Sequence, residues 1–128
     1  VRVVGRDATF ADLRRKCVVA HPSVLVHRSV YERFGRFDAN FRIAGDHEFL
    51  LRVWPKVKVA FVDDVLVEMR AGGASSTPGA APKALRESMA AAVLHGASPV
   101  AAAVRYHYEL LKFRLFFARR FRDAAERA

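Results

Sequence analysis

The pattern of apolar and polar positions predicts several short strands. Four runs rich in valine and other apolar residues have the length or the alternation of strands. They cover residues 1–4, 17–29, 57–62 and 65–69. His21-Pro22 interrupts the second run, because proline has no N–H to donate to a neighbouring strand.

Between and after these runs, the spacing of apolar residues predicts four helices that each bury one face. Ser29 and Glu32 form a capping-box pattern at the start of the first helix. The other three begin at Asp46, at Pro82 and at Ser98-Pro99. The resulting order is strand, strand, helix, helix, strand, strand, helix, helix. It predicts an α/β fold with a mixed sheet of few strands, too few for a complete doubly wound sheet.

Composition fits one globular domain with acidic partners. The chain has 128 residues, of which 52% are hydrophobic and 27% charged, and its net charge is +9. Such an excess of cations is typical of proteins that meet nucleic acid, anionic lipid or a phosphate-bearing substrate. Cys17 is the only cysteine, which excludes an intrachain disulfide and fits a reducing, cytoplasmic setting. The absence of an initiator methionine suggests a piece of a longer protein.

Asp46 is the strongest candidate for chemistry, because it directly follows Gly45 at the mouth of an apolar helix. As an N-cap, it would accept hydrogen bonds from N–H groups two or three residues on and stabilise the helix by about 1 kcal/mol. As a carboxylate at the edge of a cleft, it would accept a proton from a substrate. Local sequence favours the cap. Glu48 lies only two residues away and points to another side of the helix, so the pair does not predict a metal site.

Two further segments have alternative interpretations. Residues 70–76, "RAGGASS", are compatible with a phosphate-binding nest or with an ordinary loop. The last helix is basic and amphipathic, which is typical either of a membrane-surface helix or of a helix docked on its own domain. Its apolar stripe consists of Tyr106, Leu110, Phe113, Phe117 and Phe121.

The motifs taken together resemble a known enzyme family. "AHPSVLVHRSVYERFGRFDANFRIAGDHEFLLRVW", followed by "VAFVDDVLVEMRAGGASS", is similar to the C-terminal half of family 2 glycosyltransferases of the GT-A fold. The likeness is to hexosyltransferase-like members that build bacterial polysaccharides and lipid-linked glycans. It covers residues 1–97 and implies the acceptor-side portion of a partial GT-A domain. Residues 98–128 form the separate basic helix.

The resemblance implies transfer of a sugar, with inversion, from a nucleotide diphosphate donor to an acceptor hydroxyl of a glycan or lipid-linked acceptor. It implies that Asp46 is the general base. It also implies a substrate-binding role for His21 and places a loop near the donor phosphates. The residues of that loop are Arg70, Gly72, Gly73 and Ser75.

The chain also departs from this family. The nucleotide-binding half and its Asp-x-Asp motif are not in the 128 residues, although the resemblance implies a divalent cation, Mg or Mn, in the full-length parent. We therefore expect the chain alone to be inactive. We expect it to lie peripherally at the cytoplasmic face of the membrane, held to anionic lipid by residues 98–128. The alternatives are a basic nucleic-acid-binding module, which the stripe of aromatics disfavours, and a non-catalytic membrane adaptor.

Overall fold

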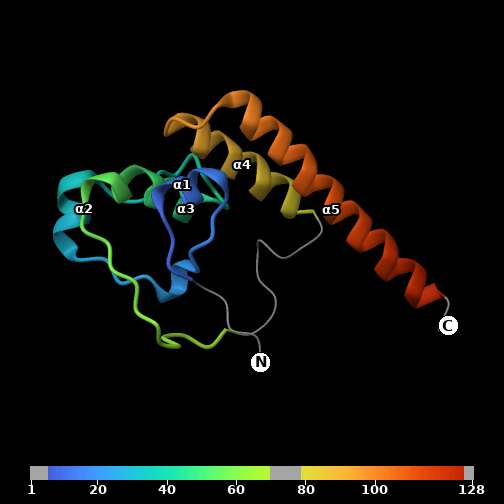
Figure 1. Cartoon of the computed structure of the whole chain (residues 1–128), viewed down its shortest axis with the longest axis horizontal. Helices are drawn as coiled ribbons and strands as arrows, with labels where there is room; N and C mark the ends of the chain where they lie inside the picture. The colour runs from blue at the N-terminus through green and yellow to red at the C-terminus, as the bar shows by residue number, and fades with distance from the viewer. Residues whose placement is uncertain (1–5, 70–78, 126–128) are drawn as a thin grey trace.

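The computed structural model describes residues 6–69 and 79–125, with side chains placed as far as Phe116. Figure 1 shows helices gathered around α3, with α4 and α5 lying along one side. Among the described helices, none combines the length and apolarity that crossing a bilayer requires. In chain order the elements are α1 (Phe10–Arg15), η1 (His21–Ser23), α2 (Arg28–Phe34), α3 (Gly45–Val53), η2 (Trp54–Lys56), α4 (Ala81–Leu94) and α5 (Pro99–Ala125).

The predicted α/β fold, and with it the partial GT-A fold with its mixed sheet, is wrong for this structure. Residues 6–69 and 79–125 contain helices and no strand. In the run at 17–29, the 3-10 turn η1 falls at the His21-Pro22 interruption, with extended backbone on both sides at Ala20 and Val24. The predicted strand at 1–4 lies outside the described residues.

The runs at 57–62 and 65–69 show why alternation misled the prediction. Both are without helix or strand, and apolar side chains such as Phe61 and Val65 stay exposed. A strand requires a ladder of hydrogen bonds to a neighbouring strand, whereas an alternating sequence specifies only a preference for extended backbone. No described segment supplies that neighbour.

The four predicted helices are confirmed as α2 to α5, but their starting signals differ in detail. His27, not Ser29, is the N-cap of α2, and its Nδ1 accepts from the Ser29 N–H at 3.3 Å. The capping box of this structure is instead at Thr9 and Asp12, at the start of α1. The pattern did not predict α1, because six residues are too few to show a helical period.

The core forms where α1, α3 and α4 meet. Leu13 of α1 and the apolar side chains of α3 are buried against the small residues Ala91 and Ala92 of α4, which allow the two backbones to approach closely. On the other side Phe49 stacks on Tyr31 of α2, with ring centroids 5.1 Å apart. Each large apolar side chain buried in this way stabilises the fold by about 1.5–3 kcal/mol. Helix α5 packs along α4.

An ionic network fixes α3 to the end of α2. Glu48 of α3 is 2% exposed, and its carboxylate accepts from Arg52 Nε at 2.9 Å and lies 3.1 Å from His95 Nε2. Arg52 also donates to the carbonyls of Phe34 and Arg36 as the chain leaves α2. A buried carboxylate is tolerated only when it is paired. Arg52 therefore neutralises Glu48 and also connects α3 to the end of α2.

We expect Arg52→Met to lower the free energy of unfolding by about 3 kcal/mol, because it leaves the buried Glu48 with only His95 as a partner. Urea denaturation measures the change. Arg28→Met is the matched control, since it breaks the exposed i,i+4 pair with Glu32. That change should cost about 1 kcal/mol or less. Equal losses in the two variants would contradict the assigned role of Arg52.

Candidate functional site

Asp46 is the second residue of α3 and does not cap it. Its Oδ1 accepts from the N–H of the next residue, His47, at 2.7 Å, and the side chain is half-buried. Ala44 occupies the N-cap position and makes no side-chain cap. The prediction that Asp46 bonds N–H groups two or three residues on is therefore wrong.

The start of α3 is satisfied instead by Glu87 of α4. Its Oε2 accepts from the N–H of Ile43 at 2.7 Å and from the N–H of Ala44 at 3.0 Å. Burial raises the pKa of Glu87, but the two N–H groups and nearby cations outweigh it, so the pKa lies below its ordinary value. Glu87 thus caps α3 from another helix, while among the described residues Asp46 has a hydrogen bond only at Oδ1.

His47 points into the core. Its Nε2 lies 2.7 Å from the Leu13 carbonyl oxygen, and its Nδ1 lies 2.6 Å from Ser88 Oγ. Since a carbonyl only accepts, Nε2 carries the hydrogen and the Ser88 hydroxyl donates to Nδ1. Burial disfavours the charged ring and lowers the pKa of His47, although the Leu13 carbonyl and Asp46 act in the opposite direction. His47 is therefore neutral and joins α1, α3 and α4.

The three polar residues at the start of α3 thus have separate surroundings. Asp46 is partly accessible, His47 is buried against α1 and α4, and Glu48 is buried beside Arg52. The described part of the chain contains no group of three or more His, Cys, Asp and Glu side chains placed to hold a metal ion. Of the three, only Asp46 is available to a substrate.

Cys17 is a neighbour of Asp46 that sequence reasoning missed. Burial, followed by the negative charge of Asp46, raises the pKa of the Cys17 thiol to about 11. The thiol donates weakly to the Val19 carbonyl, with 3.7 Å between sulfur and oxygen. Cys17 is therefore protonated at neutral pH and is no nucleophile. No spacing rule connects positions 17 and 46, so the sequence carried no signal for this contact.

Among the described residues, His21 is the other predicted site residue, and its side chain contacts an aromatic ring. His21 lies edge-on to Phe37, with ring centroids 5.4 Å apart, and its buried Nδ1 has no hydrogen-bond partner among the described residues. Phe37 in turn packs on Phe49, so aromatic rings connect His21 to α3. Four predicted positions lie outside the described residues: Arg70, Gly72, Gly73 and Ser75.

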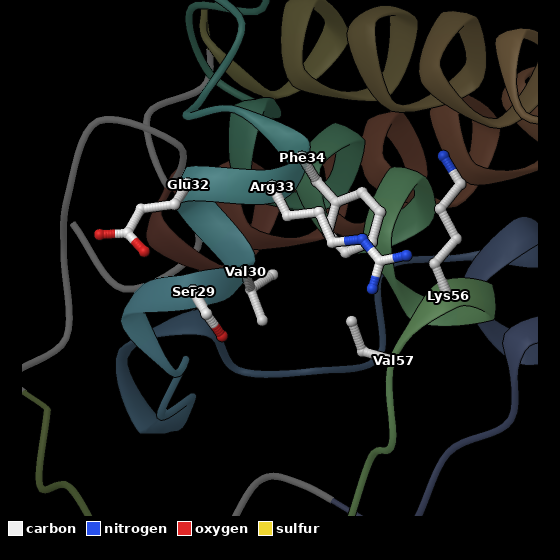
Figure 2. A pocket seen from close by; sticks show the side chains of 7 residues that line it. All are labelled: Ser29, Val30, Glu32, Arg33, Phe34, Lys56 and Val57. Atoms are coloured by element: carbon white, nitrogen blue, oxygen red, sulfur yellow. The ribbon is translucent and has the colours of Figure 1, made fainter.

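Two surface hollows lie on α2, and neither is lined by Asp46. One, of about 480 Å³, opens between α2 and η2, where Figure 2 shows Ser29, Val30 and Val57 around the opening. Within it, Arg33 and Lys56 each place a cation over the Phe34 ring. The second hollow has a volume of about 420 Å³ and is lined by Arg28, Tyr31, Glu32, Arg36 and Phe37.

Comparison of the chain with protein-family models, with curated proteins and with solved structures found no match. The relation to family 2 glycosyltransferases therefore stays a prediction that depends on the quoted residues and on the position of Asp46.

The neutral, buried state of His47 makes stability depend on pH. Below pH 6.5, the ordinary pKa of histidine, the unfolded chain takes up a proton that the folded chain resists, so the free energy of unfolding falls as pH drops. Glutamine at this position can donate to the Leu13 carbonyl and accept from Ser88 without titrating. As pH drops through this range, we expect the free energy of unfolding of the wild type to fall by up to about 1.4 kcal/mol per pH unit more than that of His47→Gln. Urea denaturation at several pH values measures the difference.

The matched control is His107→Gln, which changes an exposed histidine on α5. Its dependence on pH should follow that of the wild type. If His47→Gln shows the same slope as the wild type, the assigned neutral state of His47 is wrong.

Proposed function

We propose that the chain supplies the acceptor side of an inverting glycosyltransferase and that Asp46 is its general base. One observation supports this choice. At the start of α3, where the sequence resembles the acceptor-side motif, Asp46 alone keeps a carboxylate oxygen that no described residue engages. The neighbouring His47 and Glu48 are buried and serve the fold. Residues 6–69 and 79–125 contain no GT-A sheet, so the proposal depends on the residues and not on the fold.

The proposed chemistry is a single displacement. An acceptor hydroxyl attacks the anomeric carbon from the face opposite the nucleotide diphosphate, and its proton passes to Oδ2 of Asp46. The new carbon–oxygen bond forms as the bond to the diphosphate breaks, and the diphosphate leaves with that electron pair.

The remaining parts of such an enzyme are not among the described residues. The divalent cation implied by the resemblance would neutralise the departing diphosphate, but no group of side chains among the described residues fits it. The proposal therefore places nucleotide binding in further polypeptide and expects the 128 residues alone to show no turnover.

We expect Asp46→Asn, made in the intact polypeptide that contains these residues, to lower kcat for sugar transfer by about 10²- to 10⁴-fold, because the amide cannot accept the proton. Affinity for the nucleotide sugar, measured by calorimetry, should stay unchanged. Asp64→Asn is the matched control, since this acid is exposed and lies far along the chain from α3. Its kcat should equal that of the wild type.

The thermal unfolding midpoint of Asp46→Asn should also match the wild type, because its single hydrogen bond is to an adjacent N–H group. A folded Asp46→Asn enzyme with near-normal turnover would remove Asp46 from the mechanism.

A further inference from the structure

Helix α5 has two apolar faces, and only one of them is used by the fold. The stripe singled out by the sequence, represented by Tyr106, Leu110 and Phe113, is half-buried on the side of α5 that packs along α4. A second stripe, here called the outer stripe, is exposed on the opposite side of the helix. Its members are 55% to 74% exposed and are Val100, Val104, Tyr108, Leu111 and Leu115.

The outer stripe is continuous. Its residues follow one another at intervals of four, four, three and four positions, which keeps them on one side of a helix over about four turns. Figure 1 shows α5 running beside α4 and continuing past it. The exposure of the outer stripe places this side of α5 away from the packed face. Isolated exposed apolar residues need no explanation, but an exposed row of five along one helix indicates a binding surface.

Cations border the outer stripe on both sides. By helical spacing, Arg105 and Lys112 lie along one edge and Arg114 lies along the other. Lys112 Nζ is 4.6 Å from the centroid of the Tyr108 ring, so its cation reaches the stripe itself. A long basic side chain beside an apolar surface can bury its stem and keep its charge in a polar layer.

One carboxylate pairs with two of these cations, so the positive charge along the stripe is only partly balanced. Glu109 is the only acid in residues 99–116, and its side chain is 15% exposed. This one carboxylate is shared by three cations: Lys112 Nζ at 2.9 Å, Lys16 of the loop after α1 at 3.7 Å, and Arg105 Nη2 at 3.9 Å. The accessible side of α5 is therefore apolar in the middle and positive at both edges.

An apolar stripe with cationic edges favours some binding partners over others. A second copy of the chain would bring cations at the edges of its stripe against the same cations, which is unfavourable. Nucleic acid would neutralise the cations but would leave the apolar stripe in contact with water or phosphate. An anionic lipid surface satisfies both features, since acyl chains accept the stripe while phosphate headgroups meet the cations.

We propose that α5 lies in the surface of an anionic membrane, with the outer stripe toward the acyl chains and with Arg105, Lys112 and Arg114 at the headgroup phosphates. The other apolar stripe attaches the domain to the helix through α4. The stripe that contains Tyr106, Leu110 and Phe113 is thus not the membrane-facing one. The proposal does not depend on the sugar transfer proposed above.

The test uses the full 128-residue chain and flotation with two kinds of vesicle. One is pure phosphatidylcholine, and the other is phosphatidylcholine with phosphatidylglycerol at roughly three to one. We expect the chain to float with the anionic vesicles, to bind the neutral vesicles at least about tenfold more weakly, and to be released from the anionic ones by salt.

Two double variants separate the contributions. Val104→Ser with Leu111→Ser makes the stripe polar, and Arg105→Gln with Arg114→Gln removes a cation from each edge. Each should weaken binding to anionic vesicles by about tenfold or more. Circular dichroism should match the wild type, since Val104, Leu111 and Arg114 are exposed and the Arg105 side chain at the edge of the stripe is 41% exposed. Val59→Ser with Phe61→Ser, which alters two apolar residues outside α5 that are each 48% exposed, is the control and should bind as the wild type does.

Three results would overturn the proposal. The first is binding that does not distinguish the two vesicles. The second is a loss of binding in the control variant equal to that in the Val104→Ser, Leu111→Ser variant. The third is retention on DNA or on an acidic protein, or a dimer in light scattering that the outer-stripe variant disperses, in the absence of vesicle binding.

Discussion

The structure depends on how α3 satisfies its polar groups while it is buried. His47 and Glu48 are almost fully enclosed, and such groups destabilise a core unless each finds a partner. His47 is bound by the Leu13 carbonyl of α1 and the Ser88 hydroxyl of α4. Glu48 is bound by Arg52 of α3 itself, which also donates to the Phe34 carbonyl at the end of α2. Apolar packing is largely non-directional, whereas these bonds are directional, so they define where each neighbour lies against α3.

The periphery of the domain differs from its core in leaving apolar side chains exposed. The buried polar side chains of α3, His47 and Glu48, are paired, but the irregular segment at 57–69 and the outer stripe of α5 leave apolar side chains in water. Helix α5 attaches to the domain through one face, so its other face is free to carry a second pattern of apolar and basic residues. A helix with two apolar faces shows no single clear period, and the sequence pattern therefore emphasised the stripe richest in aromatic residues.

The sequence could predict features that depend on residues close to one another along the chain. Four helices have the spacing of a buried face together with nearby start and stop residues, and α2 to α5 confirm them. The strands failed because alternation encodes extended backbone, whereas a strand also needs a partner that no described segment provides. Glu87 is a second example of a contact that local sequence cannot predict. Its bonds to Ile43 and Ala44 replace a local cap with one from a distant helix, and no local pattern encodes such a contact.

The cap made by Glu87 also changes the meaning of Asp46. The sequence allowed two roles for this side chain, helix cap and general base, and the cap was the simpler prediction. With the cap formed by Glu87, Asp46 keeps one bond to an adjacent N–H group and adds little to the attachment of α3. Its neighbour Cys17 stays protonated and offers no competing nucleophile. Glu87 stabilises the start of α3, whereas Asp46 is the proposed general base. A loss of activity in an Asp46 variant that still folds can therefore be attributed to the proposed proton transfer.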